Sequence, residues 1–581
     1  MLFNRASSKP PAPAPARAPA APAANKPNVA VREGSQAAAS RIKTFSDIPP
    51  YSRLLSIGDR PTVQLSKEDS RHVAVVELTG GKNALIIHCK AGDTLLHSLT
   101  GQLRSAQYSV RVADADLAVI AELTKASAGQ DGHTRVANEY MQVAHELLAY
   151  AVANRATDIH LEIRGTAGRV RFRIDGYMEA MRTEGRGEYP AAFLEKVMMQ
   201  LFNSEQQKKS NNSPLFSRDN FDYCMIPYSD IPGNDLKLRF QGFRGAEGPK
   251  VVLRLLPVGD QQKARTFEEL GYAPSQIQIW NEVMQTPSGM GFIAGVTGSG
   301  KSSTLKTWVD LNPYSEQCAV YTVEDPVEYS MKAHQIPIQR DLADPVGSAR
   351  AYGEAAAAIV RGDNDIVIVG EIRDRISANS AQQFAETGAM ALGTLHAHLL
   401  SGMVPRLVNP EIGMNRETLT GPNTLSLLAY QALVPRLCPH CAMHLPEAVE
   451  KDPLIKTIVG HMAAIQFDAQ PLRWKRLGGC SECSQRGTVG LTVVAEMLMP
   501  DDDWLRAVRK GDDAEAAAVY SSYSNGDLKS IDMTGKTVFE HTLHKALTGG
   551  VDARECARFD LWSRYVRRKK LGASQRTSAA I

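Results

Sequence analysis

One glycine-rich segment constrains the fold of this chain more than any other feature. Residues 292–304 read Phe-Ile-Ala-Gly-Val-Thr-Gly-Ser-Gly-Lys-Ser-Ser-Thr, which contains the pattern G-x-x-x-x-G-K-S. An apolar strand pattern precedes it and a helical pattern over 304–311 follows. In this pattern the backbone N–H groups wrap phosphates, the lysine reaches the β and γ oxygens, and the serine hydroxyl serves Mg²⁺. The segment therefore predicts an α/β domain with these nucleotide-binding residues: Gly295, Val296, Thr297, Gly298, Ser299, Gly300, Lys301, Ser302 (also the magnesium ligand) and Ser303.

Polar side chains follow three further apolar runs downstream of this loop. Glu324, Asp325 and Glu328 follow the first run, Glu371 follows the second, and His396 follows the third. Because the carboxyl ends of parallel strands meet at one edge of a sheet, we expect these side chains to lie beside the loop. Phosphoryl transfer needs an acid there, to hold Mg²⁺ or to orient the attacking water. Taken alone, His396 is more typical of a hydrogen-bonded core histidine.

Upstream of the loop, the sequence predicts a long helix followed by a sheet. Apolar residues recur on one helical face from Val136 to Ala151. Period-2 alternation then predicts strands over 158–163, 169–175, 236–241 and 250–256. In the second of these strands Arg169, Arg171 and Arg173 share one face. By itself, that face is typical of a sheet surface solvated by arginines.

Four of the eight cysteines form two C-x-x-C pairs, at Cys438, Cys441, Cys480 and Cys483. In a reducing cytosol such pairs are typical of metal ligands rather than of disulfides. Four thiolates suit tetrahedral Zn²⁺ and leave no open position, so we expect a structural zinc site. Two alternatives stay open. His440 or His444 could replace a cysteine ligand, or the pairs could form a redox-active dithiol.

Together these segments resemble the ATPase family of type II secretion and type IV pilus assembly. The family motifs with matching segments are the Walker A loop (295–304), the aspartate box Thr-Val-Glu-Asp-Pro-Val-Glu-Tyr (322–329), the Walker B motif Ile-Val-Ile-Val-Gly-Glu-Ile-Arg-Asp (366–374), the histidine box Gly-Thr-Leu-His (393–396), and the signature of the second N-terminal domain (156–162 and 170–176). The resemblance runs from about Asn138 to Asp560. The chain has Ala389 where the family usually has a histidine, and Ala397-His398 where it usually has Thr-Asn. His396 is therefore the histidine that carries over.

The resemblance implies an α/β fold with a RecA-like P-loop ATPase core, preceded by a small mixed-sheet, PAS-like domain. It also implies a ring of six subunits that holds ATP between these two domains. Arg239 and Arg254 would then lie near the phosphates as charge stabilisers. A tetracysteine insertion is a feature of the assembly branch of the family, and the retraction branch lacks it.

Length and composition fit a chain of several globular units. The 581 residues are 43% apolar and 22% charged, and Lys+Arg 66 nearly balance Asp+Glu 63. That balance argues against a chain that coats nucleic acid. No apolar run reaches the roughly 20 residues that a membrane span needs, and the N-terminus lacks the apolar core of a signal peptide. We therefore expect a soluble protein on the cytosolic side. The family resemblance implies that it associates peripherally with the bacterial inner membrane through its partners.

The predicted divisions are a disordered Pro/Ala-rich leader (1–44), a small α+β module (45–129), a second N-terminal domain (130–262), the ATPase domain (263–436), a tetracysteine zinc module (437–500), a C-terminal helical region (501–571) and a tail (572–581). For the α+β module, a partner-docking role and a spacer role stay open. In the C-terminal part, helices are expected over 495–509 and 537–547.

The expected function is a hexameric, Mg²⁺-dependent ATPase that powers type IV pilus extension or pseudopilus assembly. Ser302 and one or both of Glu324 and Asp325 are expected to serve the metal. Glu371 is expected to position or activate the water, and His396 to sense the γ-phosphate. ATP, Mg²⁺ and Zn²⁺ are the expected cofactors. The expected partners are an inner-membrane platform protein and a cytoplasmic docking protein, with no nucleic acid. The rivals are a pilus-retraction motor, a DNA-translocating conjugation motor, and a zinc-stapled scaffold that binds nucleotide without hydrolysing it. The intact Glu371 argues against the scaffold.

Overall fold

The computed structural model describes residues 41–56, 61–66, 68–79, 82–126, 130–183, 186–203, 216–219, 221–258, 265–338 and 345–579. Most of the predicted leader lies outside these residues. Residues 39–581 form one compact unit that contains three sheets. In the described part of the chain, no helix combines the length and the low polarity that crossing a bilayer requires.

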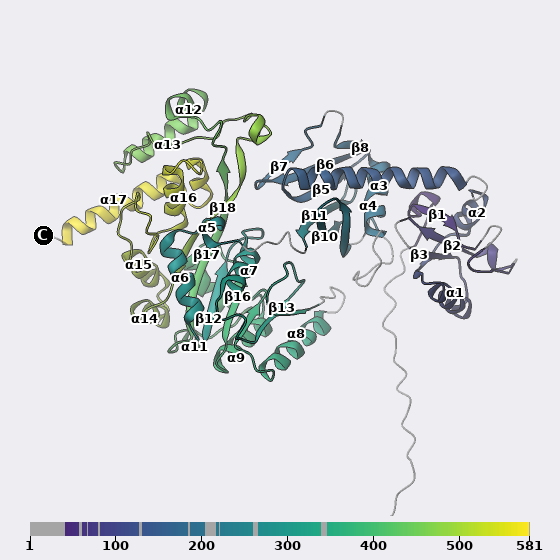
Figure 1. Cartoon of the computed structure of the whole chain (residues 1–581), viewed down its shortest axis with the longest axis horizontal. Helices are drawn as coiled ribbons and strands as arrows, with labels where there is room; N and C mark the ends of the chain where they lie inside the picture. Colours follow the sequence, from purple (N-terminus) through teal and green to yellow (C-terminus); the bar gives the residue numbers. More distant parts are fainter. Residues whose placement is uncertain are drawn as a thin grey trace, which may run out of the picture. The chain divides into compact units, whose positions relative to one another are not determined.

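The largest sheet has seven strands in the order β14-β13-β15-β16-β12-β17-β18. Its strands are β12 (Gly289–Ala294), β13 (Val320–Glu324), β14 (His334–Pro337), β15 (Ile366–Val369), β16 (Met390–Leu395), β17 (Leu425–Leu437) and β18 (Thr488–Leu498). All neighbouring pairs are parallel except β17 and β18. Figure 1 shows β12, β16 and β17 side by side in teal and green. The strand that precedes the glycine-rich loop is thus in the interior of a mostly parallel sheet, as predicted.

Helices cover both faces of this sheet, because its strands are apolar on both sides. Along β12, Phe292 packs into one hydrophobic cluster and Ile293 into another. One face packs against α5 (Phe267–Leu270), α6 (Pro274–Gln285) and α7 (Lys301–Leu311). The other face packs against α8 (Pro345–Val360), α9 (Arg375–Glu386), α10 (Met403–Val408), α11 (Arg416–Leu419), α14 (Asp502–Lys510) and α15 (Asp513–Ser522). A mostly parallel sheet with helices on both faces confirms the predicted α/β class.

The second sheet is antiparallel and forms the domain before the ATPase core. Its strands are β5 (Ala156–Arg164), β6 (Ala167–Ile174), β7 (Tyr177–Ala180), β8 (Glu188–Pro190), β9 (Tyr223–Ile231), β10 (Asn234–Phe243) and β11 (Lys250–Pro257). Two helices, α3 (Gln130–Ala153) and α4 (Ala191–Asn203), share its hydrophobic core. The predicted strands are confirmed, and the turn between β6 and β7 has positive φ at Asp175 and Gly176.

A smaller four-stranded sheet lies nearest the N-terminus. It has the order β1-β2-β3-β4, with β1 (Tyr51–Leu54), β2 (Val73–Leu78), β3 (Asn83–His88) and β4 (Ser109–Asp114). Residues of α1 (Asp93–Ser105) and of α2 (Leu117–Ala126) belong to two different clusters on this sheet. The module is therefore α+β with its own core, as the sequence indicates.

The C-terminal part corrects one prediction. The expected helix 495–509 is wrong over its first residues, because Ala495 to Leu498 end strand β18 and are fully buried there. Pro500 and the N-cap Asp501 follow, and α14 begins only at Asp502. The helix expected over 537–547 is confirmed as α16 (Val538–Leu547). It shares a separate core with α12 (Leu445–Lys451), α13 (Pro453–Ala463) and α17 (Trp562–Ala579).

Candidate functional site

The glycine-rich loop joins β12 to α7 through three glycines with positive φ. Gly295, Gly298 and Gly300 have φ values of 158°, 79° and 86°, a region that other residues rarely adopt. At Gly295 a Cβ atom would lie 2.4 Å from the carbonyl oxygen of Gln431 in β17. Only glycine lets the loop pass that close to the neighbouring strand. The loop ends at the N-terminus of α7, where free N–H groups and the helix dipole favour an anion.

Lys301 begins α7, and its ammonium group lies inside the loop. Nζ donates to the carbonyl oxygens of Gly295 and Val296, at 2.9 Å and 3.3 Å. Burial lowers the pKa of Lys301, and the carboxylates of Glu371 and Glu328 oppose that shift. A positive charge beside the start of the helix is what the binding of a polyphosphate requires.

Glu371 and His396 meet at the carboxyl ends of β15 and β16. Glu371 Oε1 lies 3.2 Å from Nε2 of His396. The other ring nitrogen, Nδ1, lies 3.0 Å from the carbonyl oxygen of Gly295. A carbonyl oxygen only accepts, so Nδ1 carries a hydrogen in this contact. The His396 side chain is 45% exposed, so it is not a buried core histidine, and it links Glu371 to the loop.

Ser302 and Glu328 form the second contact between the loop and a strand end. Ser302 Oγ donates to Glu328 Oε2 at 3.0 Å. The other oxygen of Glu328 lies 3.7 Å from Nη1 of Arg239 in β10. Hydroxyl and carboxylate oxygens are the ligand types that Mg²⁺ prefers in proteins. Ser302 and Glu328 together therefore fit that cation.

Glu324 and Asp325 contact side chains other than Ser302. Glu324 is 8% exposed and accepts a hydrogen bond from Thr322 at 2.6 Å, and burial raises its pKa. Asp325 accepts from both terminal nitrogens of Arg373, each at 3.3 Å. Nη1 of Arg373 also lies 4.0 Å from Glu371 Oε2. Arg373 therefore connects the 322–329 segment to Glu371.

A single cavity of about 1190 Å³ collects these groups. Besides the loop and the strand ends, it is lined by Arg173, Arg239 and Arg254 of the antiparallel sheet. Arg254 donates through Nε to Asp158 at 3.0 Å. The guanidinium of Arg239 lies over the ring of Tyr223, 5.8 Å from its centroid. Both arginines are thus held in place by neighbours while they face the cavity.

Nearly all the residues predicted for nucleotide binding and catalysis line this cavity, namely Val296, Thr297, Gly298, Ser299, Gly300, Lys301, Ser302, Ser303, Glu324, Asp325, Glu328, Glu371, His396, Arg239 and Arg254. Gly295 contributes its carbonyl oxygen to Lys301 and His396. No role for Tyr223 or Arg373 was predicted from the sequence. Arg373 lies two positions after Glu371 in the loop at the sheet edge. This closeness in sequence to Glu371 is the signal that could have identified it as a site residue.

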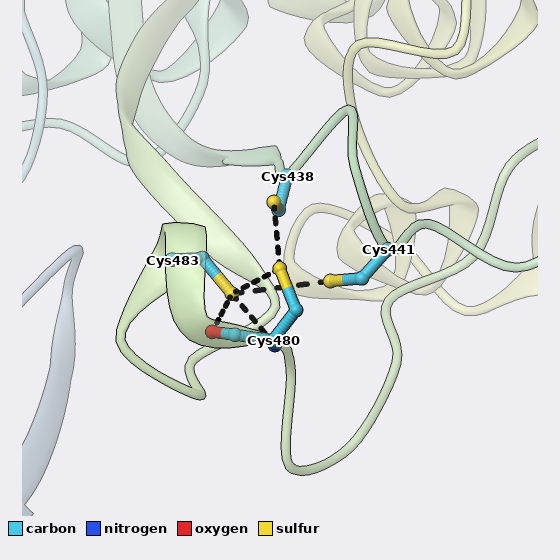
Figure 2. Close-up of side chains that lie close together, drawn as sticks. All are labelled: Cys438, Cys441, Cys480 and Cys483. Atoms are coloured by element: carbon cyan, nitrogen blue, oxygen red, sulfur yellow. Dashed lines mark hydrogen bonds between the residues drawn. The ribbon is translucent and has the colours of Figure 1, made fainter.

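The two C-x-x-C pairs come together as one cluster of four sulfurs. Cys480 Sγ lies 3.8 Å from Cys438 Sγ and 3.7 Å from Cys483 Sγ, and Cys441 Sγ lies 3.9 Å from Cys483 Sγ. All four sulfurs lie within 4.8 Å of one another, and Figure 2 shows them pointing toward a common centre. Zn–S bonds of about 2.3 Å in a tetrahedron place sulfurs about 3.8 Å apart. The cluster therefore fits a zinc ion.

The geometry favours one of the alternatives for these cysteines. The four-sulfur group contains neither His440 nor His444. Cys483 accepts N–H hydrogen bonds from Cys480 and Gly487, each at 3.2 Å. Burial raises the pKa of Cys483, but these bonds outweigh it and lower the pKa to about 6. A stabilised thiolate in a cluster of four favours a metal site over two separate dithiols.

A phosphate loop on an interior parallel strand, with an acid and a histidine at neighbouring strand ends, defines a RecA-like P-loop ATPase. The chain belongs to the family described as type II/IV secretion system protein, whose profile matches residues 137–541. This is the family of secretion and pilus ATPases, so the resemblance seen in the sequence is confirmed.

Two curated relatives and one solved structure are similar to this chain. Type II secretion system protein E of Pseudomonas aeruginosa is 30% identical over 369 residues, 62% of this chain and 66% of the relative. The type IV pilus assembly ATPase TfpB of Acinetobacter baylyi is 30% identical over 355 residues, 61% of this chain and 56% of the relative. The match thus spans less than two thirds of either relative. The solved pilus retraction motor PilT with bound ADP has a TM-score of 0.45 and 20% identity, over 71% of this chain and 96% of that one.

Proposed function

We propose that this chain is a hexameric, Mg²⁺-dependent ATPase that powers type IV pilus extension or assembly of a type II secretion pseudopilus. The observation that carries this proposal is the convergence of Lys301, Ser302, Glu371 and His396 on one cavity in a member of this family. Each comes from a different strand end or from the loop, and together they supply the groups that phosphoryl transfer uses.

In the proposed site, Lys301 and the backbone amides of the loop bind the phosphates. Ser302 and Glu328 would hold Mg²⁺. Glu328 takes this role in place of Glu324 and Asp325, because those two carboxylates are bound by other side chains. When bound, Mg²⁺ neutralises charge on the β and γ oxygens. Asp325 acts through Arg373, which it holds beside Glu371.

The remaining residues act on the attacking water and on the developing charge. Glu371 orients the water and accepts its proton. His396, bonded to both Glu371 and the loop, senses the γ-phosphate. Arg239 and Arg254 stabilise the charge that develops on the transferred group.

Zinc in the tetracysteine cluster would be structural. The four thiolates would complete the tetrahedral coordination of the zinc ion. The ion would then link the two chain segments that carry the cysteines. Cys438 follows directly on β17, and β18 begins five residues after Cys483. The bound metal would therefore fasten the ends of two paired strands of the ATPase sheet.

The assembly role rests on two features, the cysteine cluster and the additional N-terminal module. An inner-membrane platform protein and a cytoplasmic docking protein are the proposed partners. The chain would then be cytoplasmic and associate with the membrane through them. The names of the relatives, a secretion protein E and a pilus assembly ATPase, support the same reading.

Purified full-length protein tests the proposal. We expect ATP turnover that requires Mg²⁺, a hexamer by native mass spectrometry, and no stimulation by DNA. Deleting the gene should abolish surface pili or pseudopilus-dependent secretion, since no filament is built. Cells with excess pili would identify a retraction motor instead, and stimulation of turnover by DNA would identify a translocase.

A further inference from the structure

A chain of buried polar side chains lies beneath the phosphate loop. Gln431 in β17 is fully buried, and its Nε2 donates to the carbonyl oxygen of Ser299 at 2.8 Å. Its Oε1 accepts from the hydroxyl of Tyr272 at 2.7 Å. That hydroxyl also lies 3.1 Å from Oγ1 of Thr304 in α7. The chain of contacts thus reaches both the loop and the helix that follows it.

The direction of each hydrogen bond follows from the one group that only accepts. Because the Ser299 carbonyl is an acceptor, Gln431 presents its amide N–H₂ to it and its oxygen to Tyr272. Tyr272 then donates to Gln431 and accepts from Thr304. Burial raises the pKa of Tyr272, so the hydroxyl keeps its proton at neutral pH. Each of these three hydrogen bonds therefore has one donor and one acceptor.

Gln431 lies close to two of the three loop glycines, with its backbone carbonyl next to Gly295 and its side-chain amide next to Gly300. A Cβ at Gly295 would lie 2.4 Å from its carbonyl oxygen, and a Cβ at Gly300 would lie 3.4 Å from its Nε2. Glycines give a loop many alternative backbone shapes, and fixing one shape costs entropy. Contacts that select the shape before a ligand arrives reduce that cost and raise affinity.

We propose that Gln431 is a positioning residue of the nucleotide site, with Tyr272 as the residue that orients it. Together they hold loop 295–300 in the shape whose N–H groups converge on phosphate. Gln431 does not line the cavity, so it acts on the nucleotide through the loop. The inference rests on the proposed function, because it concerns the binding of ATP. Glu371 and His396 are outside this chain of contacts, so affinity rather than the chemical step depends on it.

The test is to measure Kd for ATP and ADP, and kcat at saturating ATP, in Gln431→Glu and Tyr272→Phe. Gln431→Glu keeps the size of the side chain but puts an acceptor against the Ser299 carbonyl. We expect its Kd for both nucleotides to rise about tenfold or more, with kcat within about threefold of wild type. Tyr272→Phe, which removes one atom, should raise Kd less. In the Gln431→Met background, Tyr272→Phe should raise Kd by a smaller factor than it does in wild type, because its contact with Gln431 is already lost and only its contact with Thr304 remains to lose.

Gln276→Met is the matched control. Gln276 is another fully buried glutamine of the same domain, and it donates to the carbonyl oxygen of Ala495 at 2.8 Å. Its loss should leave Kd for ATP unchanged. A wild-type Kd in folded Gln431→Glu, or an equal rise in Gln276→Met, would overturn the inference. If Gln431→Glu does not fold, the Kd of the Tyr272→Phe variant for ATP tests the inference in its place. A wild-type protein that does not bind ATP would instead overturn the proposed function.

Discussion

Glu371 Oε1 and His396 Nε2 lie 3.2 Å apart at the ends of adjacent parallel strands, while His396 Nδ1 reaches the carbonyl oxygen of Gly295 at 3.0 Å. The imidazole therefore joins the acid to the first glycine of the phosphate loop.

Replacing His396 by alanine should lower turnover while leaving ATP binding nearly intact. Without the imidazole, Glu371 loses its link to the loop, and misplacing a catalytic group costs about 10- to 100-fold in rate. ATP affinity should change by less than about threefold, since the loop and Lys301 remain. His461→Ala, on α13, is the control. Wild-type kcat in His396→Ala would show that His396 only packs against the loop.

Arg239→Ala and Arg254→Ala should reduce kcat much more than ATP affinity. A guanidinium that meets charge only as the transition state forms acts on the rate, by about tenfold or more for a lost donor. Arg169→Ala is the matched control, because that arginine is 64% exposed and pairs with Glu188 at 3.4 Å. If an Arg239 or Arg254 variant forms hexamers and hydrolyses ATP at the control's rate, that arginine has only a structural role in the antiparallel sheet.

Cys480→Ser should remove bound zinc and loosen the cysteine module without unfolding the ATPase sheet. Structural Zn²⁺ contributes on the order of 10 kcal/mol in small domains, so its loss exposes the local chain. Elemental analysis should give one zinc per wild-type chain and much less in the variant, with faster proteolysis between 438 and 487. Cys318→Ser, outside the cluster, should keep its zinc. If wild-type protein purified without chelator contains no zinc, the assignment of the cysteine cluster as a zinc site is wrong.

Acid should weaken the antiparallel sheet through Glu162. Burial raises the pKa of Glu162, but hydrogen bonds from Lys250 and Arg171 outweigh it and lower the pKa to about 2. A folded-state pKa below the ordinary 4.5 means stability that is fully present above about pH 4.5 and is lost as pH falls toward about 2. Glu162→Gln should therefore lower the urea midpoint at pH 7, and the gap to wild type should close on acidification. A gap that does not depend on pH would contradict this.

Local patterns explain how much of this structure the sequence predicts. The glycine spacing of 295–300 and the apolar run before Glu371 are encoded within a few residues, so the loop and the strand ends can be placed from sequence. Local patterns do not show which of the three acids in segment 322–329 contacts Ser302. Glu324, Asp325 and Glu328 lie within five residues, and only the packing that buries Glu324 and turns Asp325 toward Arg373 leaves Glu328 against Ser302.

Contacts between distant parts of the chain explain what the sequence did not predict. Gln431 and Ser299 are 132 positions apart, and no periodicity relates them. The run from Ala495 to Leu498 is buried on both faces, so its apolar residues fit a buried helix or a buried strand equally well. Pairing with β17 decides in favour of the strand.

The central claim is that Lys301 binds the nucleotide and Glu371 activates the water. Glu371→Gln keeps the size of the side chain, cannot accept the proton, and removes one negative charge from beside the triphosphate. ATP should therefore bind as tightly as in wild type or more tightly, while turnover falls by about 10²-fold or more. Lys301→Ala should lose the nucleotide itself.

Measuring ATP affinity and steady-state phosphate release in these two variants is the most direct test. The account predicts ATP trapped without hydrolysis in Glu371→Gln and weak binding in Lys301→Ala. Near-normal phosphate release from Glu371→Gln would contradict it, because Glu324, Asp325 or Glu328 would then have to orient the water.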